Sequence, residues 1–398
     1  MKILMLNYEF PPIGGGGGQA HRALLQQYAG RPDLEVDVVT SAPKPGVFME
    51  QMAANVLIFK VGIRKKNLHF WRRREVMEWL LKAGECHRRL VKTGDYDLVH
   101  AFFGFPTGWL CYKTARRVPY IISLRGSDVP GVNARLKLEY KVLGPLVFKP
   151  IWKRASALVA CSEGLKQRAL KFLPSAAIEV IPNGVDLEVF HPAQATAELS
   201  KDKPADARGP SSVSRFKMEA STLHLLTVGR LSATKRLPLL IDAISILRSQ
   251  GCTAHLTVVG GGALEPQLRR LLGERNLRDA VTLLGRRGAE EMPPLYRQHD
   301  VYVSATAQEG MSNAMLEAMA SGLPIVTTRC EGVEELISDN GVVVESQEPA
   351  DLAQAIRRVA GDSARFLSMS VAARRRAEQL SWGVVADRYI DVYKRIRK

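Results

Sequence analysis

The chain has 398 residues, of which 46% are hydrophobic and 24% charged. This composition excludes collagen-like, coiled-coil and wholly disordered proteins. No apolar run approaches the roughly 20 residues that a membrane-spanning helix needs, and the first apolar run is too short for a signal peptide. The five cysteines lack the paired spacing of zinc or disulfide sites. We therefore expect a reduced, cytoplasmic protein of two or three domains.

The formal net charge of +16 is unevenly distributed along the chain. Residues 1–182 hold 28 basic and 14 acidic side chains, whereas the remainder holds 28 and 26. Nearly all of the positive excess therefore lies in the first half. Such an asymmetry indicates an anionic partner for that half, which is a nucleic acid, an acidic membrane face or a negatively charged substrate.

Short apolar runs alternate with segments of helical period along the whole chain. The strands expected in the first half are Lys2–Asn7, Val36–Thr40, Val56–Val61, Leu98–Phe102, Tyr120–Leu124, Ala157–Ala160 and Ile178–Ile181. Those of the second half are Leu223–Val228, His255–Val259, Val281–Leu284, Val301–Ser304, Pro324–Thr327 and Val342–Val344. Runs rich in Val, Ile and Leu suit parallel strands buried on both faces. The alternation predicts an α/β protein with two doubly wound sheets.

The junction between the two sheets is expected near Pro182, because Pro ends a strand and the Asn-Gly that follows favours a turn. This divides the chain into a basic domain at 1–182, a second domain at 183–380 and a terminal helix at 381–398. Residues 194–221 are rich in Ala, Ser, Lys, Asp and Pro, and they predict a flexible insertion.

A run of five glycines, Gly14–Gly18, follows the first expected strand and precedes the helical segment Gln19–Ala29. Glycine leaves backbone N–H groups unobstructed, and a helix N-terminus adds a favourable dipole, so amides near Gly16 and Gly17 suit a diphosphate. The pattern is not the dinucleotide fingerprint, because no acidic residue ends the strand Val36–Thr40. A nicotinamide-dependent oxidoreductase is therefore disfavoured.

The segment 304–324 carries the most informative pattern of the chain. Glu309 stands in a loop after a strand, Ser312 is a good N-cap for a short helix Asn313–Ala320, and Gly322 suits its end. A carboxylate accepts hydrogen bonds from sugar hydroxyls, so Glu309 suits a sugar.

The same helix supplies further candidates for a nucleotide. Glu317, about one turn inside the helix, suits the two hydroxyls of a ribose. Amides at the helix N-terminus would face a phosphate, and they belong to Gly310, Met311, Ser312, Asn313 and Ala314.

Arg230 and Lys235 follow the first strand of the second half, at the edge where doubly wound sheets bind ligands. An Arg fork and a Lys point charge suit a departing diphosphate. A protein that only binds nucleotide or nucleic acid would not need these two side chains to converge with Glu309 and Glu317.

These motifs together resemble the signature of retaining glycosyltransferase family 4. They are Gly-Arg-Leu with Lys235 five positions after the Arg, Gly260-Gly-Gly262, Leu284-Gly285, and Gln308-Glu-Gly followed by Leu-Glu-Ala-Met-Ala-Ser-Gly-Leu-Pro324. Pro182–Pro192 resembles the segment between the family's domains, and the glycine run and Glu331–Ile337 also match. The likeness runs in matching order over nearly the whole chain.

The resemblance implies a GT-B fold, in which two Rossmann-like domains face a cleft and the last helix crosses back to the first domain. It implies sugar transfer from a nucleotide sugar with retention of configuration, without a metal ion or a cofactor other than that co-substrate. By position, Arg230 and Lys235 would neutralise the diphosphate, Glu309 would contact the donor sugar and Glu317 the ribose. The leaving phosphate would take the proton of the acceptor.

One position departs from the family pattern. Many members place a histidine after the strand Tyr120–Leu124, where this chain has Arg125. Arginine stays protonated, so it cannot act as a general base, but it can clamp an anionic acceptor or the diphosphate, with Asp128 holding it. His100, at the end of its strand, is a second acceptor-side candidate. His21, in the first turn after the glycine run, is a further candidate site histidine.

The basic excess has a focus at Arg64–Arg74, where Lys and Arg are interleaved with Phe70 and Trp71. This pattern suits an anionic membrane surface or non-specific nucleic-acid binding. A lipid-linked acceptor favours the membrane, with no specific nucleic-acid partner, so we expect a peripheral protein at the inner face of the plasma membrane.

The sequence thus predicts a retaining, metal-independent hexosyltransferase that uses a UDP-sugar, or GDP-mannose as second choice, on a lipid-linked or anionic glycan acceptor. Two alternatives stay open at this stage. One is a transferase for a soluble acceptor, of the glucan or sucrose synthase kind. The other is a non-enzymatic nucleotide- or nucleic-acid-binding protein.

Overall fold

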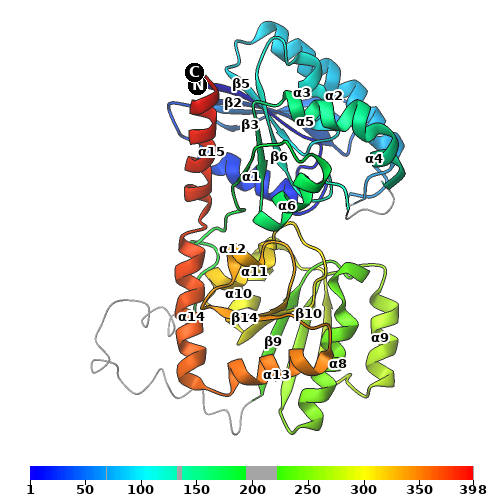
Figure 1. The fold of residues 1–398 in the computed structure, drawn as a ribbon, viewed down its shortest axis with the longest axis vertical. Helices are drawn as coiled ribbons and strands as arrows, with labels where there is room; N and C mark the ends of the chain where they lie inside the picture. The colour runs from blue at the N-terminus through cyan, green and yellow to red at the C-terminus, as the bar shows by residue number, and fades with distance from the viewer. Residues whose placement is uncertain (69, 132–136, 194–221, 398) are drawn as a thin grey trace, which may run out of the picture. The chain divides into compact units, whose positions relative to one another are not determined.

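The computed structural model describes residues 1–68, 70–131, 137–193 and 222–397 (Figure 1). The insertion expected at 194–221 lies outside the described residues. The chain forms two compact units: unit 1 contains Met1–Asn183 and Trp382–Lys398, and unit 2 contains Gly184–Ser381. The last helix therefore belongs to unit 1 although it follows unit 2 in the sequence.

Unit 1 contains a sheet with the strand order β3-β4-β2-β1-β5-β6-β7-β8. All neighbouring strands run parallel except β3, which is antiparallel to β4. The strands are β1 (Lys2–Asn7), β2 (Glu35–Ala42), β3 (Val47–Ala53), β4 (Val56–Gly62), β5 (Leu98–Phe102), β6 (Tyr120–Leu124), β7 (Ala157–Ala160) and β8 (Ile178–Val180). The residues of β5 and β6 are all buried, as expected for central strands of a covered parallel sheet.

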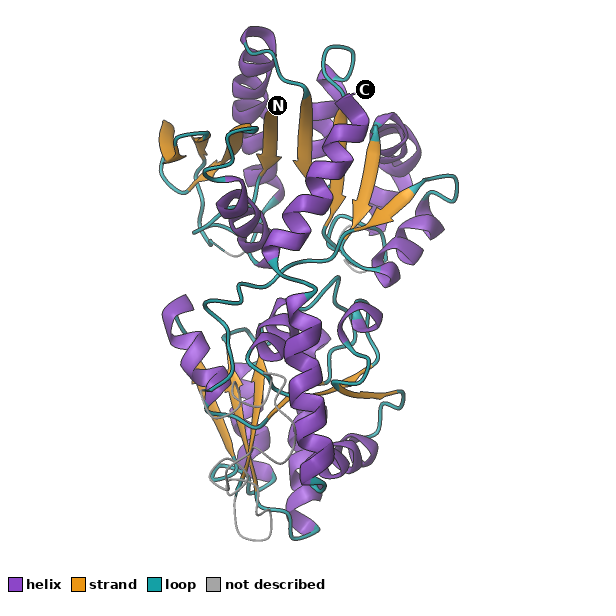
Figure 2. Cartoon of the chain, turned by 90° about the vertical axis from the view of Figure 1, so that its left-hand side faces the viewer, coloured by secondary structure: helices purple, strands orange, loops and turns teal. Residues whose placement is uncertain are grey.

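Helices cover both faces of this sheet (Figure 2). They are α1 (Gly16–Tyr28), α2 (Arg73–Thr93), α3 (Thr107–Thr114), α4 (Lys137–Leu143), a π-helical turn η2 (Gly144–Phe148), α5 (Lys149–Arg154), α6 (Glu163–Phe172) and α15 (Trp382–Arg397). The terminal helix α15 packs on α1, where the Tyr28 and Tyr393 hydroxyls are 3.0 Å apart and buried. Its apolar stripe is thereby covered inside unit 1.

Unit 2 contains a fully parallel sheet with the order β11-β10-β9-β12-β13-β14. Its strands are β9 (Leu223–Val228), β10 (Ala254–Val259), β11 (Val281–Gly285), β12 (Val301–Ser304), β13 (Ile325–Thr328) and β14 (Gly341–Val344). Its helices and 3-10 turns are η5 (Ala233–Lys235), α8 (Leu237–Ser249), α9 (Glu265–Glu274), η6 (Ala289–Glu291), α10 (Met292–Arg297), α11 (Asn313–Ala320), α12 (Val333–Leu336), α13 (Pro349–Ala360) and α14 (Ser363–Glu378). The expectation of two doubly wound sheets is confirmed.

The hairpin strand β3 was not expected from the sequence. Its residues Val47, Phe48 and Met49 are exposed, and the strand lies at the antiparallel edge of the sheet. An exposed edge strand shows neither a buried apolar run nor a regular alternation, so its pairing with β4 is decided by the turn and the neighbouring strand.

Candidate active site

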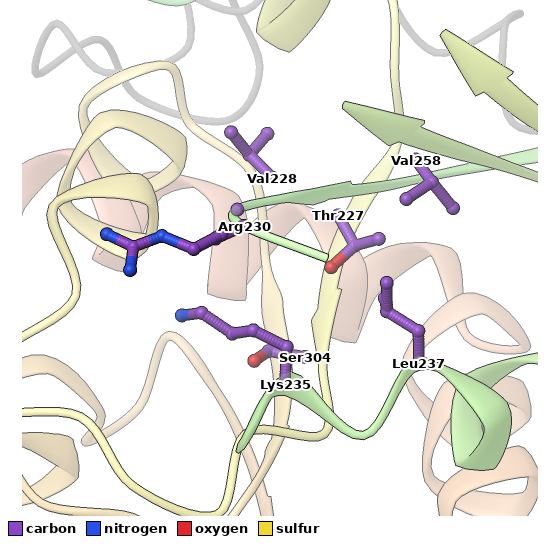
Figure 3. A pocket seen from close by; sticks show the side chains of 8 residues that line it. Thr227, Val228, Arg230, Lys235, Leu237, Val258 and Ser304 are labelled. Carbon is purple, nitrogen blue, oxygen red and sulfur yellow. The ribbon is translucent and has the colours of Figure 1, made fainter. Parts of the chain in front are cut away.

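The candidate donor site in unit 2 lies at the carboxyl ends of β9 and β12, which are neighbours in the sheet. Arg230 follows β9 and Lys235 ends the short turn η5. Figure 3 shows the two basic side chains extending in the same direction beside a small pocket. The pocket is lined by Thr227, Val228, Gly229, Arg230, Lys235, Leu237, Val258 and Ser304. Two positive charges thus stand at the sheet edge where ligands bind in this kind of fold.

Lys235 and Glu309 form an ion pair within unit 2. Both side chains are about four-fifths covered, with exposed fractions of 21% and 23%. A partly shielded pair of this kind is screened less than a surface pair. The structure therefore brings together two of the residues that the sequence singled out, and Arg230 lies beside them on the same pocket.

Arg236 was not singled out by the sequence, yet it joins the loops that carry Lys235 and Glu309. Its guanidinium donates to the Ala305 carbonyl (2.6 Å) and to the Thr328 hydroxyl (3.0 Å). Its backbone is left-handed, with φ of 45°, which is uncommon for a side chain of this size. In the sequence Arg236 is indistinguishable from a surface base beside Lys235, because no pattern reports a left-handed backbone at an arginine.

Two glycines explain how closely the loops after β9 and β10 approach each other. Gly260 has a φ of +140°, and a Cβ there would lie 1.9 Å from the Gly229 carbonyl oxygen. A Cβ at Gly262 would lie 2.3 Å from the Leu231 oxygen. The Gly260–Gly262 motif is therefore required by backbone packing next to Arg230.

The helix α11 has the termini that the sequence predicts. The Ser312 hydroxyl accepts a hydrogen bond from the Met315 amide (3.3 Å), and Gly322, with φ of +78°, follows the last turn. Met311 and Ser312 are buried, whereas Gly310, Asn313 and Ala314 are half-buried. The helix N-terminus thus lies in the loop that carries Glu309.

Glu317 lies on α11 and accepts a hydrogen bond from the Tyr296 hydroxyl (2.8 Å). Burial raises the pKa of the Glu317 carboxyl to about 7, and the hydrogen bond from Tyr296 opposes this shift. Tyr296 is fully buried, and the sequence offers no signal that separates it from an ordinary core aromatic. Glu317 therefore changes its charge near neutral pH.

In unit 1 the glycine run Gly14–Gly18 continues into α1, and Gly16 and Gly17 are the first two residues of this helix. A Cβ at Gly17 would lie 2.7 Å from the Phe103 ring. The Glu9 carboxylate accepts a hydrogen bond from the Gly15 amide (3.3 Å). The loop therefore contains a carboxylate that the sequence analysis overlooked, because Glu9 precedes the glycine run and belongs to no motif.

Arg125 follows β6, and its contacts differ from those expected. Its guanidinium donates to the Asn183 side-chain oxygen (2.7 Å) and to the Tyr389 hydroxyl of α15 (3.2 Å). The Asp128 carboxylate instead accepts hydrogen bonds from the backbone amides of Gly104 (2.6 Å) and Arg125 (2.9 Å). The expectation that Asp128 holds the guanidinium was wrong. This carboxylate orders the loop through backbone amides, and Asn183 and Tyr389 hold the Arg125 side chain.

His100 is fully buried, which corrects its expected place on the acceptor side. Its ring nitrogens lie 2.7 Å from the Tyr393 hydroxyl and 2.7 Å from the Ser123 hydroxyl. Burial lowers the pKa of His100 well below its usual value, so the ring is neutral. A buried, neutral imidazole with both nitrogens engaged cannot contact an acceptor, and it supports α15 instead.

His21 is buried as well, stacked on Phe102 with 4.2 Å between ring centroids. Burial, and secondarily the Arg125 charge, lowers the pKa of His21 to about 3. It therefore stays neutral at physiological pH and packs between strand and helix.

The basic segment Arg64–Arg74, apart from His69, lies among the described residues, and it divides into two sets. Lys65 points inward and pairs with Glu75 at 2.8 Å, with exposed fractions of 0% and 6%, and its ammonium lies 3.8 Å from the centre of the Trp71 ring. Arg64, Lys66, Phe70 and Arg72–Arg74 are exposed. Lys65 and Trp71 are therefore structural, which sequence spacing alone does not reveal.

On α2, Met77 and Leu81 are 55% and 71% exposed and stand one turn apart. They extend the surface that begins with Phe70 and Arg72–Arg74. We call Phe70, Arg72–Arg74, Met77 and Leu81 the α2 surface. It combines apolar and basic side chains on α2 and on the segment directly before it.

Within the described ranges, no helix is long and apolar enough to cross a membrane. No group of three or more His, Cys, Asp and Glu residues in that part of the chain is arranged to hold a metal ion. The charged side chains of the candidate donor site are those of Arg230, Lys235 and Glu309.

Two family models match the chain in order along its length. Residues 15–189 match the model described as Glycosyltransferase Family 4, and residues 222–362 match the model of Glycosyl transferases group 1. The chain is a glycosyltransferase of the family 4 type. The first match contains Gly16, Gly17 and Arg125, and the second contains Arg230, Lys235 and Glu309.

Relatives and solved structures agree with this assignment. An uncharacterized glycosyltransferase of Methanocaldococcus jannaschii is 25% identical over 99% of this chain and 98% of the relative. A D-inositol 3-phosphate glycosyltransferase of Pseudarthrobacter chlorophenolicus is 31% identical over 54% of this chain and 50% of its own length.

Among solved structures, the sucrose-phosphate synthase of Thermosynechococcus elongatus superposes with a TM-score of 0.78 at 21% identity, covering 99% of this chain and 98% of that one. The Anabaena protein HepE in complex with UDP-glucose gives 0.71 at 19%, covering 99% and 100%. Together with the two parallel sheets, these neighbours show that the glycosyltransferase has the GT-B fold.

The raised pKa of Glu317 predicts a pH-dependent stability for this glycosyltransferase. A carboxyl whose pKa rises on folding favours the folded state below its unfolded pKa, and that advantage is lost as pH rises through about 7. As the pH rises from 5 to 8, we expect the melting temperature of Glu317→Gln to increase by a few °C relative to that of the unchanged protein. Thermal unfolding of both proteins at several pH values measures this gain, with Glu290→Gln, an exposed carboxyl, as the control. A constant difference between the two proteins at all pH values would contradict the assignment.

Proposed function

We propose that this glycosyltransferase moves a hexose from a nucleotide-diphosphate donor, with retention of configuration, to a lipid-linked or anionic glycan acceptor. The observation that carries the proposal is the Lys235–Glu309 ion pair beside Arg230 at the carboxyl ends of β9 and β12. Two cations and a carboxylate at this edge suit a diphosphate linked to a sugar. UDP-sugars are the first choice of donor and GDP-mannose the second, since solved neighbours carry UDP and UDP-glucose.

The chemistry assigned to unit 2 is electrostatic. In the transition state the sugar becomes oxocarbenium-like and negative charge grows on the departing diphosphate. Arg230 and Lys235 stabilise that charge, and Glu309 orients the sugar through its hydroxyls. Glu317 accepts hydrogen bonds from the ribose, and the amides at the N-terminus of α11 bind phosphate.

Proton transfer is assigned to the substrate. Arg125 stays protonated and His100 is buried, so neither serves as a general base. In our proposal the leaving phosphate takes the proton of the acceptor hydroxyl on the face where the new bond forms. The charge on the diphosphate is met by protein cations, so the reaction is proposed to run without a metal ion or a further cofactor.

On the acceptor side, Arg125 is the residue assigned to an anionic group. Asn183 and Tyr389 fix its guanidinium, so it is oriented before a ligand arrives. The names of relatives such as D-inositol 3-phosphate glycosyltransferase describe acceptors with a phosphate, which supports an anionic acceptor here. A soluble acceptor is the second candidate, supported by the likeness to sucrose-phosphate synthase.

The donor is tested by ligand-induced stabilisation. A ligand that binds only the folded protein raises its melting temperature, and at a hundredfold excess over Kd the gain is about 2.7 kcal/mol. We expect UDP and UDP-sugars to raise the melting temperature by several °C, with the same shift in the presence of a chelator. A thermal-shift screen of UDP, GDP and ADP with their common sugar conjugates measures this. A shift with GDP alone would move the assignment to GDP-mannose, and no shift with any nucleotide would contradict the donor site.

Glu309→Gln separates sugar contact from nucleotide binding. We expect transfer to fall by about a hundredfold or more, because a contact made to the reacting sugar is lost. Affinity for the nucleotide alone should change by less than about threefold, because Lys235 keeps its charge. Sugar transfer and nucleotide titration measure the two effects, and Glu290→Gln in the same unit is the control. Normal turnover of Glu309→Gln would defeat the role given to this carboxylate.

We further propose that the protein works as a peripheral protein on the cytoplasmic face of an anionic membrane, through the α2 surface. Phe70, Met77 and Leu81 offer apolar contact with 47%, 55% and 71% of their surfaces exposed, and Arg72–Arg74 offer positive charge. Basic residues near an anionic surface contribute about 1 kcal/mol each. The membrane would supply a lipid-linked acceptor to unit 1.

Replacing Arg72, Arg73 and Arg74 by Gln should weaken binding to anionic vesicles by about a hundredfold, the equivalent of about 3 kcal/mol. Hydrolysis of a soluble donor should stay unchanged, because these side chains belong to unit 1 and the proposed donor residues belong to unit 2. Vesicle sedimentation measures the effect, and a variant with Gln at Arg270, Arg358 and Arg375, exposed arginines of unit 2, removes the same charge elsewhere. Equal sedimentation of the two variants would remove the α2 surface from the proposal.

A further inference from the structure

A second basic site lies in unit 1 at the edge of the sheet opposite to Arg125. A pocket of about 440 Å³ opens at the amino ends of β6 and β7, where α3 and α5 end side by side (Figure 1). It is lined by Ala115, Arg116, Arg117, Val118, Pro119, Tyr120, Lys153, Arg154 and Ser156. Because β6 has five residues, about 16 Å of strand separate this pocket from Arg125. The pocket is therefore distinct from the candidate acceptor site.

The charge of this pocket is entirely positive. Arg116, Arg117, Lys153 and Arg154 are exposed side chains, and no Asp or Glu contributes to the lining. Among the residues that the structure describes, no carboxylate forms an ion pair with any of the four. Other arginines, such as Arg248, Arg269 and Arg329 of unit 2, do pair with neighbouring carboxylates.

Helix termini account for only part of this charge. Cations are common near helix C-termini, because each helix C-terminus carries about half a negative elementary charge. The ends of α3 and α5 together therefore offset about one of the four positive charges. About three remain in one pocket, and holding like charges together without a counterion destabilises the protein. An excess of this size indicates a bound anion.

The chemistry of the lining selects a phosphate group. Guanidinium forks bind phosphate oxygens bidentately, and the pocket offers three such forks, one ammonium and the Ser156 hydroxyl. The volume is within the range of small-molecule sites, and the walls offer little apolar surface for a base or an acyl chain. We propose that this pocket binds a phosphomonoester or diphosphate group, independently of the donor site in unit 2.

The test measures pyrophosphate binding by calorimetry in full-length protein that carries Arg230→Gln and Lys235→Gln, so that the proposed donor site does not contribute. Arg117→Gln with Arg154→Gln removes two forks of the pocket. Arg358→Gln with Arg375→Gln is the matched control, because it removes the same charge from exposed positions of unit 2. A second arm measures sedimentation of the same proteins with phosphatidylcholine vesicles containing 20 mol% phosphatidic acid, which presents the same group on a lipid.

We expect the pocket variant to bind pyrophosphate at least tenfold more weakly, while the control binds like its parent, because two charge-assisted contacts are lost. A loss confined to the pyrophosphate arm identifies a soluble ligand, and a loss confined to the vesicles identifies a lipid headgroup. Equal behaviour of pocket variant and control in both arms overturns the proposal. Lys153→Gln provides a second variant, and circular dichroism checks that each protein is folded.

Discussion

Parallel strand pairing is the constraint on which both units depend. Apart from the antiparallel strand β3, the strands of each sheet run parallel, so the carboxyl ends of neighbouring strands meet at one edge. In unit 2 this edge brings the loop after β9, with Arg230 and Lys235, next to the loop after β12, with Glu309. In unit 1 the glycine run follows β1 and Arg125 follows β6 at the same edge, with β5 between these two strands. Residues far apart in sequence meet because the strands before them are neighbours.

Neutral polar groups hold two arginines, Arg236 and Arg125, in place. Arg236 donates to a backbone carbonyl and a threonine hydroxyl, and Arg125 donates to an amide oxygen and a tyrosine hydroxyl. Such partners orient a guanidinium without neutralising it, so the positive charge stays available to an anion. The terminal helix α15 supplies Tyr389 to this arrangement, and the buried contacts of Tyr393 with Tyr28 and His100 fix that helix. The end of the chain thus orients a residue of the first sheet.

The sequence was sufficient to predict the bounds of an element wherever a local pattern indicates burial or helix capping. The strands β1, β5, β6, β7, β9 and β12 and the helix α11 have the bounds expected from their apolar runs and from the Ser312 cap. It was insufficient where a side chain's direction decides its role. Lys65 looked like part of a basic surface and is instead buried against Glu75 and Trp71, and His100 looked like a site residue and is instead held between Ser123 and Tyr393.

Fold class, most of the strands and the capped helix α11 could be predicted from the amino-acid sequence, because buried periodicity, glycine and caps are local properties of the chain. Which charged side chains lie together and which face solvent depends on the packing of elements that are distant in the sequence. Arg236 and Tyr296 became visible through contacts across 69 and 21 positions, and Glu9 through its contact with the Gly15 amide in one loop. The basic pocket between α3 and α5 likewise exists only because two helix ends meet. Such contacts depend on how elements pack, and packing leaves no periodic trace in the sequence.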